Sequence, residues 1–173
     1  MKTISSFVSS YNLLDEYYLI SKHYSDADIY AFISLSYIKP PGPKSMVNDF
    51  NNVLKSTCLN FHLNHRQFNY LMYILRIELS DNDKLHIHSV LFNDIKLNKI
   101  LPLHFCNVFY NKWKNTTRSR TSIVKPNDFL NNGYLKYCFK LSEHERYIIE
   151  NTSNKNNLPL VILSNGILKT INV

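Results

Sequence analysis

Two histidines and one glutamate are the residues of this 173-residue chain whose types and spacing first indicate chemistry. The chain reads Glu78-Leu-Ser-Asp-Asn-Asp-Lys-Leu-His86-Ile-His88, and side chains along a β-strand alternate between its two faces, so the histidines are expected to share one face. If residues 80–84 form the turn of a hairpin, Glu78 lies opposite His86. Two imidazoles beside a carboxylate form a donor set for a divalent cation with positions left open for substrate. The alternative is that the histidines are only the polar side of an amphipathic strand.

A tyrosine and a lysine form a second candidate pair further along the chain. The segment reads Tyr134-Leu-Lys136-Tyr137-Cys-Phe-Lys140, and a helix here would place Tyr137 and Lys140 three residues apart on one face. A phenol that attacks a phosphate benefits from a nearby ammonium, which favours the phenolate and offsets the phosphate charge. The chain has 12 tyrosines and 20 lysines plus arginines, so the alternative is a core tyrosine followed by a solvated lysine.

Apolar segments predict the elements that would position these residues. Tyr70–Leu79 and Leu85–Phe92 are rich in large apolar residues, and the polar run between them has turn composition, which predicts a β-hairpin. Tyr30–Ile38 alternates as a further strand and stops at the proline-rich run 39–43. A short strand is expected at Thr121–Lys125.

Two helices are expected further along the sequence, after the hairpin. Pro102 suits the first turn of a helix in which Phe105, Phe109 and Trp113 recur every four residues, the spacing of a core stripe. The run Ser142-Glu-His-Glu145 matches a capping box at the start of a second helix.

The motifs occur in one order along the chain. A strand Phe32-Ile-Ser-Leu-Ser-Tyr37 comes first, Glu78 ahead of His86-Ile-His88 follows, and Lys136-Tyr137-Cys-Phe-Lys140 comes last. In this combination the chain resembles the HUH endonucleases, and more narrowly the rolling-circle replication initiators of small bacterial plasmids and single-stranded phages. The resemblance covers roughly Ala31 to Lys140. It implies an α+β fold of the ferredoxin-like or RRM-like kind, in which a five-stranded antiparallel sheet is flanked by helices and carries the metal site on its central strands.

The same resemblance implies a function and a role for each motif residue. The implied reaction is metal-dependent, sequence-specific nicking and joining of single-stranded DNA through a 5′-phosphotyrosine intermediate, which initiates rolling-circle replication. His86 and His88 match the ligands of Mg²⁺ or Mn²⁺, and Glu78 matches an acidic residue that completes or orients the metal shell. Tyr137 matches the nucleophile and Lys140 the lysine one turn after it. The implied partners are single-stranded DNA or an origin hairpin, together with a host helicase and polymerase.

The chain departs from the family pattern at one position, and other functions stay open. Many initiators carry a second tyrosine or a glutamate four residues before the nucleophile, where this chain has Gly133, so Tyr134 is the rival nucleophile. A single-tyrosine transposase or a conjugative relaxase would use the same chemistry. A non-catalytic domain that binds single-stranded nucleic acid is the alternative from a different class.

Charge favours a polyanionic partner. The net charge is +7 and the pI is about 9.3. A basic cluster reads Lys112-Trp113-Lys114-Asn-Thr-Thr-Arg118-Ser-Arg120, where cations alternate with amides and hydroxyls that suit phosphate contacts. Lys114, Arg118 and Arg120 are predicted to contact DNA, as is Lys136 beside the candidate nucleophile, and Trp113 could stack on a base.

Composition predicts one main domain in the cytoplasm, without membrane contact. Residues 1–150 are expected to form the nuclease domain, and residues 151–173 a β-hairpin extension, turning at Asn165-Gly166, that packs on it. Three scattered cysteines and no Cys-x-x-Cys argue against a zinc site or disulfide framework. The first residues lack the apolar core of a signal peptide, and no segment is apolar over the length needed to span a bilayer.

Overall fold

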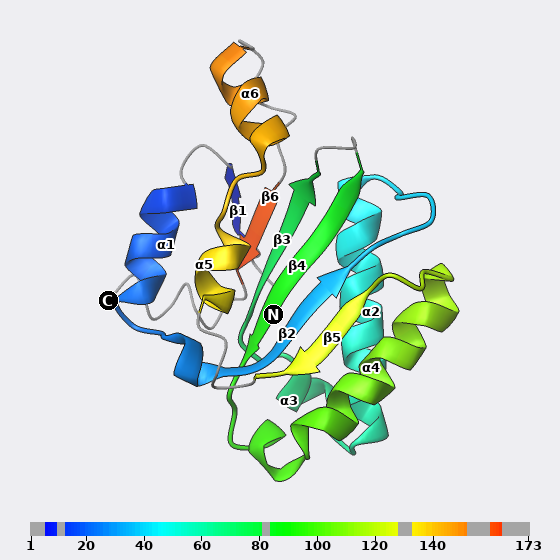
Figure 1. The fold of residues 1–173 in the computed structure, drawn as a ribbon. Helices are drawn as coiled ribbons and strands as arrows, with labels where there is room; N and C mark the ends of the chain where they lie inside the picture. Colours follow the sequence, from blue (N-terminus) through cyan, green and yellow to red (C-terminus); the bar gives the residue numbers. More distant parts are fainter. Residues whose placement is uncertain (1–5, 10–12, 81–83, 128–132, 152–159, 164–173) are drawn as a thin grey trace.

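An antiparallel sheet flanked by helices forms the centre of the fold, as the sequence predicts for an α+β protein (Figure 1). The computed structural model describes residues 6–9, 13–80, 84–127, 133–151 and 160–163. The sheet has six strands in the order β1-β6-β3-β4-β2-β5, and all neighbours are antiparallel. The expectation of five strands is therefore not confirmed. The strands are β1 (Ser6–Ser9), β2 (Ile29–Leu35), β3 (Tyr73–Leu79), β4 (Leu85–Phe92), β5 (Ile123–Pro126) and β6 (Leu160–Leu163).

Helices lie on both faces of the sheet. Helices α2 and α4 cover one face, whereas α1 and α5 lie against the other, and α6 extends past the end of the sheet (Figure 1). None of the helices in the described ranges is long and apolar enough to cross a membrane. The helices are α1 (Leu13–Ser21), α2 (Pro43–Asn60), α3 (His65–Phe68), α4 (Pro102–Thr117), α5 (Tyr134–Cys138) and α6 (Glu143–Asn151), with 3₁₀ turns η2 (Asp26–Asp28) and η3 (Leu97–Lys99).

The larger core lies between the sheet and helices α2 and α4. Pro102 stands in the first turn of α4, and the stripe of Phe105, Phe109 and Trp113 is fully buried, which confirms the predicted helix and its inward face. Burial also shows that Trp113 is a core residue and not a base-stacking surface. Its indole Nε1 donates a hydrogen bond to the carbonyl of Ser36 at 3.3 Å.

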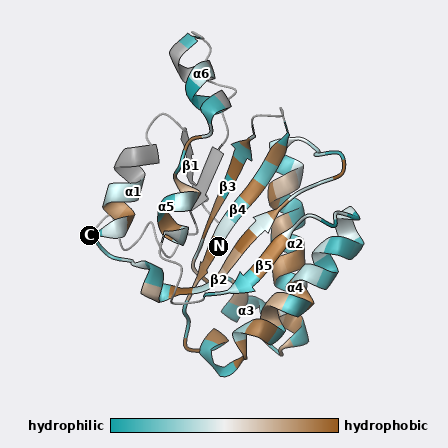
Figure 2. Ribbon diagram, viewed as in Figure 1, coloured by the Kyte–Doolittle hydropathy of each residue, from teal (hydrophilic) through white to brown (hydrophobic). Residues whose placement is uncertain are grey.

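A second, smaller core lies on the opposite face of the sheet. Alternate residues of the central strands, among them Phe32, Ile74 and Val90, pack there against α1 and α5. Apolar and polar residues alternate along β3 and β4, whereas α6 is mostly hydrophilic (Figure 2). This smaller core covers only part of the face, and the polar residues of β3 and β4 continue beyond it.

The hairpin that carries the histidines has the predicted register. Glu78 pairs directly with His86 in the antiparallel ladder of β3 and β4. The amide of Ser80 donates a hydrogen bond to the carbonyl of Lys84 at 2.9 Å, which closes the connection around residues 81–83 outside the described ranges. Strand β4 begins at Leu85 and ends at Phe92 as expected, while β3 begins at Tyr73 rather than Tyr70.

The segment after residue 150 contributes a strand to the sheet. Strand β6 lies between β1 and β3 and pairs with both. The segment therefore adds to the same sheet as the candidate site. The predicted hairpin turn at Asn165-Gly166 lies outside the described residues.

Candidate active site

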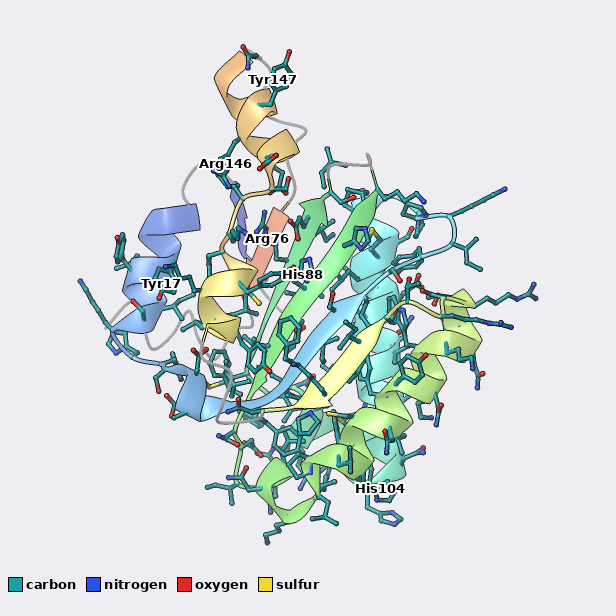
Figure 3. The ribbon with its side chains drawn as sticks, viewed as in Figure 1. Tyr17, Arg76, His88, His104, Arg146 and Tyr147 are labelled. Carbon is teal, nitrogen blue, oxygen red and sulfur yellow. The ribbon has the colours of Figure 1, made fainter. Side chains whose placement is uncertain are left out.

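A row of polar residues crosses the sheet on the face shared with α5. Strand alternation brings His86 and His88 to this face, and the register places Arg76 on one side of His88 and Ser34 on the other. His88 is 5% exposed and Arg76 is fully buried. Figure 3 shows both side chains beside α5. Ser34, His88 and Arg76 therefore form a row across three neighbouring strands, and His86 lies two residues from His88 on the same face of β4.

The Glu78 carboxylate contacts His88, its diagonal neighbour, through Oε2 and Nε2. Burial disfavours the charged carboxylate, but the hydrogen bond and charge of His88, with smaller effects of Arg76 and His86, outweigh burial and lower the pKa of Glu78. Burial, followed by the charge of His88, lowers the pKa of His86. The result is an ionised carboxylate beside an imidazole that is neutral at neutral pH.

The donor types at this place fit a divalent cation. Neutral His86 offers a lone pair, Glu78 offers carboxylate oxygens, and the buried Nδ1 of His88 has no hydrogen-bond partner among the described residues. Within the part of the chain that the structure describes, no group of three or more His, Cys, Asp or Glu side chains is already arranged around a common point to hold a metal ion. To bind a cation together with His88, Glu78 would have to give up its direct contact with the His88 imidazole.

Helix α5 brings Tyr137 onto the histidine pair. The ring centroids of Tyr137 and His88 are 4.9 Å apart with an interplanar angle of 86°, an edge-to-face contact. Tyr137 is 45% exposed, so its phenol is accessible from solvent as well as close to the imidazole. A segment distant in the sequence therefore places one accessible phenol beside the polar row.

The rival tyrosine occupies a different environment. Tyr134 is only 9% exposed and stacks on Phe32, with ring centroids 4.7 Å apart and planes 19° from parallel. The Lys125 ammonium lies 5.1 Å from the centre of the Tyr134 ring, a cation–π contact. These contacts are those of a packing residue, and of the two tyrosines only Tyr137 combines exposure with a contact to His88.

Tyr137 and Lys140 border one pocket, of about 200 Å³, together with Glu78. The predicted spacing therefore brings the phenol and the lysine to the same site, although Lys140 lies just beyond the end of α5. Burial, followed by the Glu78 carboxylate, raises the pKa of Tyr137. The phenol consequently stays protonated at neutral pH unless charge near it changes.

Helix α5 has only five residues, and side chains from elsewhere hold both of its ends. At its start the Asp26 carboxylate accepts hydrogen bonds from the amides of Gly133 and Leu135, the latter at 2.9 Å. Just beyond its end, the Arg76 guanidinium donates to the carbonyl of Lys140. Asp26 and Arg76 together therefore fix the segment from which Tyr137 projects.

Arg76 also forms a fully buried ion pair with Glu145 at the base of α6. The same carboxylate accepts hydrogen bonds from the amides of Leu79 at 3.0 Å and Ser142 at 2.9 Å. The Ser142 hydroxyl donates to the carbonyl of Leu79 at 2.6 Å and accepts from the Glu145 amide at 3.1 Å. The predicted capping box of α6 is thus confirmed, and it also ties this helix to the end of β3.

The basic cluster lies at the C-terminal end of α4, where Lys114, Arg118 and Arg120 are all exposed. Arg118 has a left-handed backbone conformation, with φ of 59°. It ends the helix, and its amide donates a hydrogen bond to the carbonyl of Lys114. The chain then enters β5, whose first residue pairs with Ser34, the neighbour of His88. Lys136 is exposed on α5 beside Tyr137. All four cations predicted to contact DNA are accessible to a ligand.

Sequence reasoning missed the side chains that support the site. Asp26 gave no signal beyond turn composition, and Glu145 was recognised only as a helix cap. Arg76 could have been noticed, since it shares the strand face of Glu78 within an otherwise apolar run. Comparisons with protein-family models, curated proteins and solved structures found no match for this chain.

Proposed function

We propose that this protein is a tyrosine endonuclease of the HUH type that nicks and rejoins single-stranded DNA to initiate rolling-circle replication. The observation that carries the proposal is the contact of Tyr137 with His88, at a ring distance of 4.9 Å, inside the array of His86, His88 and Glu78. A phenol, two imidazoles and a carboxylate are the groups that the resemblance to the HUH endonucleases implies for this transfer. Lys140 on the border of the same pocket adds a cation for the phosphate.

His86, His88 and Glu78 are the residues that would hold Mg²⁺ or Mn²⁺. When bound, the cation supplies Lewis-acid polarisation of the scissile phosphate and offsets its charge. Glu78 raises the pKa of Tyr137 through its negative charge. A cation held there would offset the Glu78 charge, which is the second cause, after burial, of the raised Tyr137 pKa.

In the proposed reaction the phenolic oxygen of Tyr137 attacks phosphorus. A bond forms between Oη and phosphorus, and the bond from phosphorus to the 3′ oxygen of the preceding nucleotide breaks. The phenol loses its proton and the departing 3′ oxygen gains one, which leaves a free 3′-hydroxyl and a 5′-phosphate joined to Tyr137. The side chains of Asp26 and Arg76 keep α5 in place for this attack. The 3′-hydroxyl can prime a host polymerase, and a host helicase would separate the strands.

Covalent capture of DNA tests the proposal. The wild-type protein is incubated with a labelled random-sequence library of single-stranded DNA, with Mn²⁺ or with EDTA, and adducts are resolved on a denaturing gel. We expect a Mn²⁺-dependent adduct that is absent from Tyr137→Phe. It should persist in Tyr134→Phe and in Tyr70→Phe, whose tyrosine is exposed and precedes β3, at the end of the strand away from Glu78.

Each other outcome has a definite meaning. An adduct lost in Tyr134→Phe but kept in Tyr137→Phe would identify Tyr134, and not Tyr137, as the nucleophile. DNA bound without an adduct under any condition would refute the nuclease in favour of a binding domain. Sequencing of the captured DNA separates an initiator, which selects an origin hairpin, from a transposase, which selects element ends.

A further inference from the structure

The pocket beside Tyr137 continues toward the base of α6, where its charges are not used by the proposed chemistry. Two cations, Lys140 and Arg146, and two carboxylates, Glu78 and Glu143, line the pocket with Tyr137. Figure 3 shows Arg146 near the start of α6. The proposed reaction assigns a role to Lys140 and Glu78 but none to Arg146.

The two carboxylates do not cancel the two cations at this place. Glu78 is already engaged by His88, and Glu143 is an exposed residue in the first turn of α6, where the helix terminus favours a negative charge. The Arg146 guanidinium donates through Nη2 to the carbonyl of Leu141 at 3.3 Å, which holds it at the pocket wall, and its remaining donors have no hydrogen-bond partner among the described residues.

Two backbone amides at the start of α6 are engaged within the helix cap. The amides of Ser142 and Glu145 already donate to the capping box. The Lys140 ammonium and the Arg146 guanidinium are the cationic side chains that line this pocket. A guanidinium offers two parallel N–H donors, the geometry that a phosphate accepts.

We propose that Arg146, beside Lys140, binds a backbone phosphate of single-stranded DNA next to the phosphate attacked by Tyr137. This inference rests on the proposed function, because it needs a strand that passes Tyr137. The pocket contains both the phenol and Arg146, so a strand with its scissile phosphate at Tyr137 and Lys140 brings a neighbouring phosphate to Arg146. Arg146 then acts in placing the strand and takes no part in bond cleavage.

Binding of DNA in the absence of cleavage tests this site. In a Tyr137→Phe background with EDTA, the affinity for a fluorescent oligothymidylate is measured by anisotropy over a range of salt concentrations. Loss of one phosphate contact to a single strand should reduce the slope of log K against log salt by about 0.7. We expect this reduction for Arg146→Ala, a smaller change for Arg146→Lys, and none for Arg66→Ala, an exposed arginine on α3.

A neutral methylphosphonate strand provides the matched substrate control. Arg146→Ala should bind this strand as the parent does, since no phosphate charge is left to lose. Equal salt slopes for Arg146→Ala and Arg66→Ala, or no DNA binding by the parent, would overturn the proposal. The covalent assay is independent of this one. If an adduct forms but Arg146→Ala leaves the salt slope unchanged, the phosphate site is refuted and the nuclease proposal stands. If the slope depends on Arg146 but no adduct forms, the nuclease proposal is refuted and the phosphate site stands.

Discussion

The buried ion pair of Arg76 and Glu145 predicts an asymmetric loss of stability. Glu145→Ala removes three hydrogen-bond acceptor contacts and leaves the buried Arg76 guanidinium with the Lys140 carbonyl as its one hydrogen-bond acceptor among the described residues. An uncompensated buried charge of this kind costs about 3–5 kcal/mol of unfolding free energy. Arg76→Met should cost less, because the Glu145 carboxylate keeps the amides of Leu79 and Ser142.

Urea unfolding followed by circular dichroism measures both losses. The double variant Arg76→Met with Glu145→Gln removes both charges while one amide oxygen remains as an acceptor, so it should be more stable than Glu145→Ala. Glu143→Ala is the matched control on the exposed side of the same helical turn, and it should cost less than about 1 kcal/mol. A loss below about 1 kcal/mol for Glu145→Ala, or a larger loss for Arg76→Met, would refute the reasoning.

Three further measurements test the helix anchor, the titration of the site and the buried thiols. Asp26→Ala should lower the unfolding free energy by about 0.5–2 kcal/mol and reduce adduct formation, because the amides at the start of α5 lose their acceptor. Asp26→Asn keeps one acceptor oxygen and should retain part of the stability and of the adduct. Equal effects of the two variants would argue against this role of Asp26. The pKa of Glu78 is lowered in the folded state, so its contribution to stability is present above its ordinary pKa and is lost as the pH falls through the lowered value. The stability of Glu78→Gln should therefore fall less on acidification than that of the wild type, and parallel urea-derived curves would contradict this. Burial raises the pKa of the three thiols, Cys58, Cys106 and Cys138, to about 12. A thiol reagent at mildly alkaline pH should therefore react with them only after unfolding, and rapid labelling of the native protein would contradict this.

Local regularities of the sequence were enough to predict the centre of the candidate site. Strand alternation and turn composition gave the hairpin in which Glu78 pairs with His86, and the structure has this register. Helical spacing gave the buried stripe of α4. Both patterns depend on residues that are close in sequence and lie within one element or one hairpin, so a single periodicity determines which side chains share a face.

The supporting contacts could not be predicted in this way. Arg76 meets Glu145 across 69 positions of the chain, and Asp26 meets Leu135 across 109. No periodicity relates such residues, because their contact depends on how separate elements pack. The actual partner of the Glu78 carboxylate, His88 rather than the directly opposite His86, likewise depends on side-chain conformation, which the register leaves open.

The number of strands was missed for a similar reason. The segments that become β1 and β6 are four residues long and pair with each other from opposite ends of the sequence. Residues 160–163 are expected from the sequence in a C-terminal hairpin, whereas in the described sheet β6 pairs with β1 and β3, which are distant in the sequence. The resemblance to a nuclease family had covered neither segment.

The strand order has a consequence for how the protein folds. Among neighbouring strands in the described sheet, only β3 and β4 are consecutive in the sequence, while every other pairing closes a long loop. Because loop-closure entropy opposes distant pairings, this hairpin is expected to form early and the remaining strands to join it later. Glu78, His86 and His88 would then be assembled before α5 arrives with Tyr137. The site would acquire its nucleophile only once nearly the whole chain is folded.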